Sequence, residues 1–372
     1  MKGNDPMFNL TDCDYYQAIK DYASIMVFGA GVNGRMNQGL CETLKKDISC
    51  YLVSSQHAKA DSTIHGVPVR RIDDISVSEK QESLVIVGRA HKNHQETARL
   101  LREHGFCHII PGINQILPEL SEEHIASLRD VFGRDLVRHI PTCEKEQECS
   151  LRIYAVTSIN DFHKTNRRWG SKYIEYIQAG AALTRERICK IADDTGDNIS
   201  QYNRYLNETT AGYWIAKNDT QHKYVGLFHY CRGMDLSDRQ LEWIAGHDID
   251  VVLKTPMVFA YDVHSYNYDW PLRCELICQY APDYADAVSW YLKNRFFFQG
   301  NIQIAKREIF KEYYEWVFRI LKDMGEMYPD AVLKDERSFG FLVEELMNIW
   351  YIKNAGRFAF AFAPALTFEC AK

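Results

Sequence analysis

The sequence has 372 residues, of which 46% are hydrophobic and 25% charged, and its formal net charge is −6. This length predicts about two domains, and the composition is typical of a globular protein with a sizeable core. The acidic balance argues against a general nucleic-acid-binding protein, which usually carries a basic field.

No apolar run reaches the roughly 18 residues that a membrane span needs, so we expect no transmembrane helix. The amino terminus lacks the pattern of a signal peptide, and 11 cysteines without a leader indicate reduced thiols. The spacings His91/His94 and Cys274/Cys278 each lack a matching second pair for a zinc site, so we interpret them as packing or surface residues. We therefore expect a cytoplasmic protein, and a location at the inner face of the membrane stays open.

Residues 24–112 alternate short apolar strands with helical segments, which predicts a parallel, doubly wound sheet of the Rossmann-like kind. Strands are predicted at 24–28, 50–54, 65–75, 83–88 and 108–110, and helices at 29–46 and 93–106. Residues 113–140 also look helical.

The first strand is followed by Gly29, Gly31 and Gly34, which fit the pattern G-x-G-x-x-G. Such glycines let backbone N–H groups and a helix N-terminus approach a phosphate. An NAD site would also need an acidic residue at the end of the second strand, where Ser54 and Ser55 stand. Three interpretations stay open for this turn: a nucleotide or nucleotide-sugar site, an NAD site, or a relic domain with a regulatory or architectural role.

Residues 141–150 are polar and contain Pro141, so we place the domain boundary there. This predicts a Rossmann-like domain at 1–140 and a second α/β domain at 151–372. The second domain should hold strands at 151–158, 223–229, 248–256 and 357–368, helices at 171–191 and 201–218, and a helical carboxyl-terminal third.

The acidic turn at 193–200, DDTGDNIS, cannot be an EF-hand, because the twelfth position from Asp193 is Arg204. One interpretation is a helix start that is capped by Asn198 or Ser200. The alternative is a binding segment that includes Asp197.

The binding interpretation of this turn rests on the helix that should follow. Asn203 and Asn207 are spaced i, i+4 on one helix face, with Glu208 beside them, and these side chains suit the binding of hydroxyl groups.

The segment 223–233, KYVGLFHYCRG, places His229, Tyr230 and Arg232 directly after an apolar strand. Arg232 can bind phosphate oxygens in a bidentate manner, and His229 can donate a hydrogen bond, so together they could neutralise a leaving diphosphate without a metal. The alternative is that they are ordinary core and surface residues. The D-x-D pair at Asp248 and Asp250 precedes its strand instead of following it, which disfavours a metal site.

From about residue 150 to 352 the chain resembles a bacterial family of capsular and exopolysaccharide glycosyltransferases. This family was long catalogued as a domain of unknown function, and it includes proteins taken to be galactofuranosyltransferases. Six blocks carry the resemblance in order: 153–158, 196–214, 224–232, 250–256, 300–318 and 336–346. Two positions depart from the family pattern: Cys231 replaces the first of two arginines, which removes a cation, and residues 301–304 read Asn-Ile-Gln-Ile instead of Asn-Met-Phe-Ile.

The resemblance implies a GT-A-like second domain that moves a sugar from a nucleoside-diphosphate donor to a hydroxyl of a polysaccharide or lipid-linked acceptor. We expect His229 and Arg232 to stabilise the departing diphosphate, and Asp197 or Glu208, with Glu344 as a third candidate, to act as the base. The expected substrate-binding residues are Asn198, Asn203, Tyr230, Asn301, Arg337 and Glu344.

We expect no nucleic-acid partner and assign no metal ligand, while a divalent metal, peripheral membrane contact and a homo-oligomer stay open. The competing functions are a non-catalytic nucleotide-sugar sensor or scaffold and an NAD-dependent sugar-nucleotide oxidoreductase.

Overall fold

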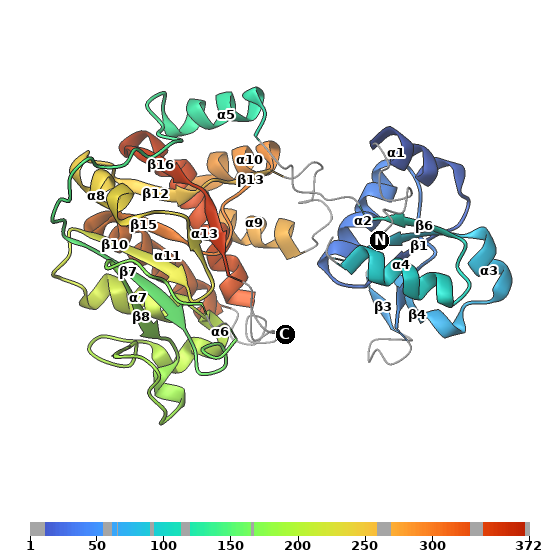
Figure 1. The fold of residues 1–372 in the computed structure, drawn as a ribbon, viewed down its shortest axis with the longest axis horizontal. Helices are drawn as coiled ribbons and strands as arrows, with labels where there is room; N and C mark the ends of the chain where they lie inside the picture. The colour runs from blue at the N-terminus through green and yellow to red at the C-terminus, as the bar shows by residue number, and fades with distance from the viewer. Residues whose placement is uncertain are drawn as a thin grey trace. The chain divides into compact units, whose positions relative to one another are not determined.

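The computed structural model describes residues 12–54, 62–64, 66–89, 93–112, 120–164, 167–258, 269–327 and 338–368. The chain forms two compact units, which we describe separately (Figure 1). The first unit contains the elements from α1 (Asp12–Asp21) to β6 (His108–Pro111). The second contains those from α5 (Glu122–Phe132) to β17 (Ala365–Thr367).

The first unit is built on a sheet in the order β3-β4-β2-β1-β5-β6. Its strands are β1 (Ile25–Phe28), β2 (Cys50–Val53), β3 (Thr63–Ile64), β4 (Val67–Arg71), β5 (Leu84–Val87) and β6. All neighbours pair in parallel except β3 with β4. The strand order reverses at the β1–β5 boundary, so the predicted doubly wound sheet is confirmed.

Helices cover both faces of this sheet, and they are α1, α2 (Val32–Thr43), α3 (Val77–Glu82) and α4 (His94–Glu103). Side chains of β1 alternate between two apolar clusters, because successive strand residues point to opposite faces. Ile25 and Val27 pack in a cluster with Leu40 of α2, whereas Met26 packs in a second cluster with Leu101 of α4. Burial on both faces explains why the strand reads as a continuous apolar run.

The second unit is built on a seven-stranded sheet in the order β16-β12-β15-β10-β7-β8-β9. Its strands are β7 (Leu151–Thr157), β8 (Ile174–Gln178), β9 (Ile191–Ala192), β10 (Tyr224–His229), β12 (Val251–Lys254), β15 (Gln303–Lys306) and β16 (Phe360–Ala363). Strand β15 is antiparallel to both of its neighbours, and the other pairs are parallel. The carboxyl ends of β7, β10 and β12 therefore meet the amino end of β15 at one edge of the sheet.

Two small sheets lie outside the large one: β11 (Arg232–Met234) pairs with β17, and β13 (Met257–Val258) pairs with β14 (Phe296–Phe297). The helices are α5, α6 (Asn203–Leu206), α7 (Thr209–Asn218), α8 (Asp238–Gly246), α9 (Asp269–Tyr280), α10 (Ala285–Asn294), α11 (Arg307–Met327) and α13 (Ser338–Asn354). The α/β class and the helical carboxyl-terminal third are thus confirmed. Much of the high aromatic content lies in the core, where Tyr313, Tyr314, Trp350 and Tyr351 are fully buried.

The division between the units differs from the expected boundary at 141–150. It falls between Gly112 and Leu120, so α5 and the segment after it belong to the second unit. The reason is aromatic packing that the sequence pattern does not reveal. Phe132, at the end of α5, lies 4.9 Å from Phe360 and 5.3 Å from Phe362 between ring centroids, and both partners belong to β16.

One predicted helical segment is wrong, and two others are helical over only part of their length. Residues 171–191 contain β8 and the start of β9 instead of an α-helix, because the parallel pairing of β8 with β7 and of β9 with β8 outweighs their local helical pattern. The expected helix at 201–218 is interrupted after α6. In the predicted helical region 113–140, α5 ends at Phe132, and residues 113–119 lie outside the described residues.

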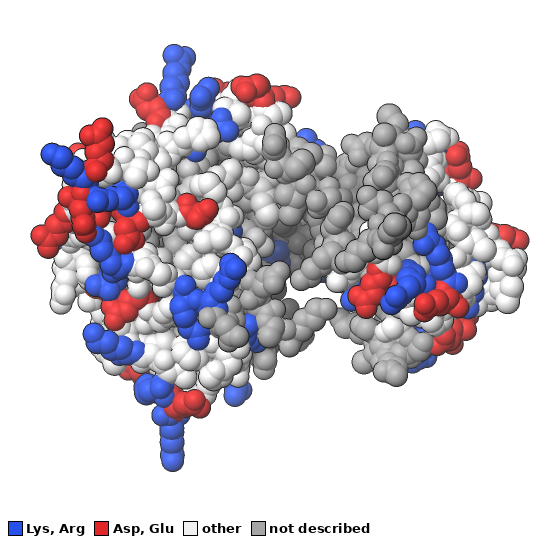
Figure 2. Space-filling model, viewed as in Figure 1, with Lys and Arg blue, Asp and Glu red and all other residues white. Residues whose placement is uncertain are grey.

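In the described parts of the chain no helix is long and apolar enough to cross a bilayer. On the face drawn in Figure 2, Lys and Arg side chains are interspersed with Asp and Glu side chains, in keeping with the modest net charge.

We predict that Phe132→Ala lowers the free energy of unfolding of the second unit by about 3 kcal/mol, because a buried aromatic side chain leaves a cavity. All seven tryptophans lie at or after residue 169, so urea unfolding followed by tryptophan fluorescence measures this loss. The control is Asp130→Ala, an exposed position of α5, which should change stability by less than about 0.5 kcal/mol. Equal stability of Phe132→Ala and the wild type would contradict the placement of α5 in the second unit.

Candidate active site

The edge of the second sheet gathers polar side chains from three adjacent strands. The strand register pairs Leu227 of β10 with Gln303 of β15, and Gln303 with Leu253 of β12. His229 and Asn301 both lie two residues beyond this row, and Lys254 lies one residue beyond it. Ligands of open α/β sheets bind outside such strand ends.

The turn before β15 binds two carboxylates. Gly300 has φ +89° and Asn301 has φ +51°, a region that is rare for residues other than glycine but tolerated by asparagine. The Gly300 N–H donates to Glu344 Oε2 at 3.2 Å, and Asn301 Nδ2 donates to Glu208 Oε1 at 2.8 Å. The carboxylates of α13 and of the start of α7 are therefore held by consecutive residues.

Glu208 immediately precedes α7, where the helix dipole favours a negative charge. Its Oε1 lies 3.9 Å from His229 Nε2, and both side chains are 15% exposed. His229 Nε2 is buried without a hydrogen-bond partner. Burial lowers the pKa of His229. The positive charges of Arg232 and Lys254 lower this pKa further, whereas the negative charge of Glu208 and a backbone hydrogen bond with Gly300 raise it. The imidazole is therefore neutral at neutral pH.

Two cations complete the cluster. Arg232 is the first residue of β11, three residues after the last residue of β10, and Lys254 is the last residue of β12. Neither side chain forms a hydrogen bond or an ion pair with any described residue. Burial lowers the pKa of Lys254 to about 8, Arg232 adds to this effect, and Glu344 opposes it.

Glu344 reaches the cluster because α13 packs closely on α6. Gly340, one turn earlier on the same helix face, leaves no room for a side chain against the Asn207 amide. Burial raises the pKa of Glu344 to about 8, the negative charges of Glu208 and Glu345 raise it further, and the Gly300 hydrogen bond and Arg232 oppose them. Glu344 is therefore mostly protonated at pH 7.

Asp193, from the acidic turn, anchors the loops beside this site. Its carboxylate is fully buried and accepts hydrogen bonds from the backbone of Gly180 and Ala181. It also accepts from the hydroxyls of Ser200 at 2.5 Å and Thr210 at 2.6 Å. Four donors satisfy this buried charge, which gives Asp193 a structural role.

The predicted binding residue Asn203 belongs to the same network. Its Nδ2 donates to the Asn207 carbonyl at 2.6 Å and to Thr210 Oγ1 at 3.0 Å. Asn207 has φ +48°, so the helix stops and α7 begins anew after Glu208. Asn203 and Asn207 thus do not share one continuous helix face, and the break is what places Glu208 at a helix start.

Asp197 and Asn198 lie apart from the cluster. Asp197 Oδ1 accepts a hydrogen bond from Tyr213, and its backbone N–H donates to Asn218 at the carboxyl end of α7. Glu208 lies at the opposite end of that helix, roughly 15 Å away for ten residues. Asn198 donates to the Gly196 carbonyl within the turn. Of the two preferred bases, the structure therefore brings only Glu208 to His229.

Tyr230 follows His229 and continues the pairing with β7 through its backbone N–H, which donates to the Val156 carbonyl at 2.8 Å. Trp169 Nε1 donates to the His229 carbonyl at 3.1 Å and holds this strand end from the loop after β7. Arg337 lies outside the described residues.

Lys254 is the residue of the cluster that the sequence prediction missed. It ends an apolar strand in the run VVLK, as His229 ends YVGLFH, and this shared position was the available signal. Lys254 belongs to the cluster because β12 lies two strands from β10, and only the sheet order shows this.

In the first unit, Gly29 and Gly34 form the expected tight turn between β1 and α2. Gly29 has φ +108°, and a side chain on Gly34 would collide with the Gly29 carbonyl. Gly31 precedes α2, and Ser54 follows β2 where an NAD site would need an acid. A ligand at this turn stays a prediction.

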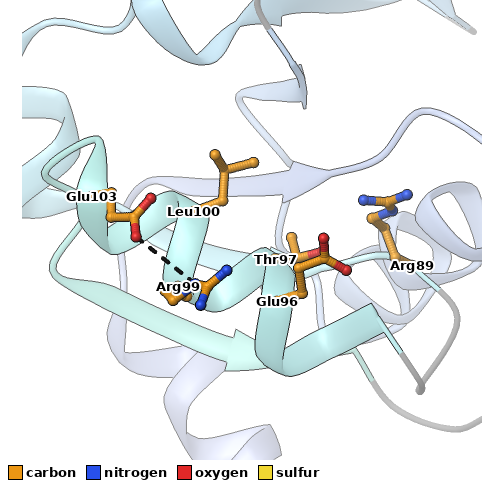
Figure 3. A pocket seen from close by; sticks show the side chains of 6 residues that line it. All are labelled: Arg89, Glu96, Thr97, Arg99, Leu100 and Glu103. Atoms are coloured by element: carbon orange, nitrogen blue, oxygen red, sulfur yellow. Dashed lines mark ion pairs between the residues drawn. The ribbon is translucent and has the colours of Figure 1, made fainter.

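A shallow hollow lies on α4 of the first unit (Figure 3). It is lined by Arg89, Glu96, Thr97, Arg99, Leu100 and Glu103. Arg99 pairs with Glu103 at 3.8 Å, and both side chains are largely exposed. Five of the six lining residues belong to α4 alone, and the charged ones face solvent, so we assign the hollow no chemistry.

The D-x-D pair does not fit a metal. Asp250 Oδ1 is 2.7 Å from Lys306 Nζ, and the side chain of Asp248 is 82% exposed. Within the described ranges no group of three or more His, Cys, Asp or Glu residues is placed to bind a metal ion.

The model of the family described as a domain of unknown function, DUF4422, matches residues 158–355, which is just over half of the chain. The chain belongs to the DUF4422 family. The match spans all the residues of the cluster just described, from Glu208 to Glu344. No curated protein matched the chain significantly.

Three solved structures are similar over part of the chain. The WbbM bifunctional glycosyltransferase, in its apo form, has a TM-score of 0.48 and 22% identity, covering 59% of this chain and 46% of that one. Core-mannan synthase A from Aspergillus fumigatus, in its Mn/GDP form, has a TM-score of 0.30 and 11% identity, covering 59% and 73%. The S. cerevisiae mannosyltransferase Ktr4p has a TM-score of 0.26 and 11% identity, covering 57% and 74%. The chain thus spans about half of the WbbM protein, and likenesses this distant carry no argument about function.

We predict that the second unit loses stability between pH 6.5 and 7.5 and that Glu344→Gln removes roughly 1 kcal/mol of this loss. Glu344 has a pKa raised to about 8 in the folded state, so the folded protein holds a proton that the unfolded chain has released above its ordinary pKa near 4.5. The stabilisation that this bound proton contributes is complete below pH 4.5 and is lost as the pH rises through about 8. Urea unfolding at both pH values measures the difference, with the exposed Glu315→Gln as control. An unchanged slope in Glu344→Gln would show that Glu344 is not a buried, protonated carboxyl.

Proposed function

We propose that the second unit is a glycosyltransferase that moves a sugar from a nucleoside-diphosphate donor to a hydroxyl of a polysaccharide or lipid-linked oligosaccharide acceptor. One observation carries the proposal: an anchored carboxylate, a neutral imidazole and an unpaired guanidinium lie together at the ligand-binding edge of an α/β sheet. The first two suit proton transfer, and the third suits an anionic leaving group.

Glu208 is the proposed base. Asn301 fixes its carboxylate at 2.8 Å, and the neighbouring His229 is neutral, so the carboxylate is not already neutralised by an adjacent ion pair. In the reaction Glu208 takes the proton of the acceptor hydroxyl while the acceptor oxygen forms a bond to the anomeric carbon of the donor. Glu344 is the weaker candidate, because its raised pKa keeps it protonated near pH 7.

Arg232 is the proposed partner of the leaving group. As the bond from the anomeric carbon to the diphosphate oxygen breaks, its electron pair passes to the diphosphate, whose growing charge the guanidinium stabilises. His229 Nε2 and Asn301 Oδ1 are buried without partners, so each can exchange a hydrogen bond with a sugar hydroxyl. The mechanism assigns no step to a metal.

The acceptor class rests on the six sequence blocks shared with the exopolysaccharide glycosyltransferase family, and the geometry of the cluster is compatible with it. Cys231, which replaces the first arginine of that pattern, is 4% exposed, and Arg232 is the arginine that remains at this strand end.

We predict that Glu208→Gln lowers the rate of sugar transfer about 100- to 10,000-fold, as expected for loss of a general base, with little change in donor affinity. The assay incubates the full chain with UDP-, GDP- and dTDP-sugars and oligosaccharide acceptors and measures the released nucleoside diphosphate and the glycosylated product. Glu308→Gln, an exposed Glu at the start of α11, is the matched control and should retain full activity.

Arg232→Ala should weaken both donor affinity and turnover, because the guanidinium acts on the diphosphate. Full activity in both Glu208→Gln and Arg232→Ala would refute this site, and loss of activity in Asp197→Asn alone would move the base to the acidic turn.

A further inference from the structure

Lys254 occupies an unusual electrostatic position. It ends β12, a strand that is buried along its whole length, and it is only 6% exposed. No described residue forms a hydrogen bond or an ion pair with its ammonium group. The charges that act on it are Arg232, which is repulsive, and Glu344, which is mostly protonated at pH 7.

Such an arrangement destabilises the folded protein. Because the Lys254 side chain is largely buried, its ammonium group loses much of its hydration, and no described residue replaces it. A second cation nearby adds repulsion, so the cost is highest when the site is empty. An anion that contacts both cations would remove this cost.

Other cations of the same unit show that the chain normally avoids this cost. Lys306, on the adjacent strand β15, lies 2.7 Å from Asp250 Oδ1. Arg273, whose side chain is 15% exposed, lies 3.3 Å from Glu345 Oε1. Lys254 is more buried than Lys306, but no carboxylate of the described ranges lies within ion-pair distance of it.

We propose that Lys254 and Arg232 together bind the diphosphate group of the donor, a role that rests on the proposed function of the second unit. Strand β12 lies two positions from β10 in the sheet, which puts their backbones roughly 10 Å apart. Arg232 follows β10 by three residues, and its charge acts on Lys254 at the end of β12. A lysine and an arginine this close can contact one diphosphate, with the guanidinium bidentate and the ammonium as a point charge.

Lys254 thereby supplies the second cation that Cys231 does not. Cys231 is buried and cannot carry a positive charge, and its backbone carbonyl accepts a hydrogen bond from the Phe368 N–H, so this position serves the packing of the β11–β17 sheet. The two positive charges match the two negative charges of a diphosphate diester without a metal.

The test compares Lys254→Met with Lys306→Met in the full chain. Thermal unfolding is followed by tryptophan fluorescence at constant ionic strength, with inorganic phosphate, pyrophosphate, UDP, GDP or dTDP added. We expect Lys254→Met to raise the melting temperature of the ligand-free protein, because it removes an unpaired buried charge. We also expect it to weaken pyrophosphate and nucleoside-diphosphate binding about 10- to 100-fold, as for loss of one charge-assisted hydrogen bond.

Lys306→Met should show the opposite pattern, with a lower melting temperature and unchanged ligand binding, because it breaks an ion pair outside the site. Lys254→Gln, which is shorter and polar, repeats the test if Lys254→Met fails to fold.

Unchanged diphosphate binding in the Lys254 variants would overturn the inference and leave the glycosyltransferase proposal standing. A lower melting temperature together with unchanged binding would make Lys254 a structural residue. An equal response to phosphate and pyrophosphate would contradict a diphosphate site. Lysine-dependent binding of pyrophosphate without sugar transfer from any donor would support the inference and refute the proposed function. Absence of binding in the wild type would refute both.

Discussion

The antiparallel strand β15 is the constraint on which the candidate site depends. It lies between β10 and β12, whose directions agree, so its amino end is brought to the edge where their carboxyl ends lie. The Gly300–Asn301 turn must therefore form between His229 and Lys254. A fully parallel sheet would place the amino end of this strand at the opposite edge and leave the two carboxylates without their donors.

The charges of the site are held apart by this turn instead of being paired with one another. Glu208 and Glu344 are bound by neutral donors, Asn301 and the Gly300 backbone, while Arg232 and Lys254 have no ionic partner among the residues that the structure describes. Direct ion pairs would be more stable, but they would leave no charge free to bind a ligand. Under the proposed function, this arrangement gives up stability for ligand binding, as is common at active sites.

The acidic turn illustrates how residues that suit ligand binding can serve the scaffold. Asp193 satisfies four donors from three segments, and the Asn203 amide binds the backbone at Asn207. These bonds fix the point where α6 stops and α7 begins, and so they set the position of Glu208. The turn therefore contributes to the site by positioning Glu208. Its exposed residue Asp197 lies at the other end of α7, beside Asn218.

The sequence by itself determined the main strands of the first sheet, strands β7, β10, β12 and β16 of the second, most of the helices and the glycine turn of the first unit, because these follow from local periodicity. It also determined the chemical character of His229, Arg232 and Glu208, which follows from side-chain type. It did not predict β8, β9 or β15, whose extended form depends on pairing with strands elsewhere in the chain. Only the tertiary structure decided which of the candidate residues meet. The break at Asn207, the assignment of α5 to the second unit and the place of Lys254 all depend on pairings between segments far apart in the chain. A local pattern cannot encode them, because strand order and register are set by the packing of the whole sheet.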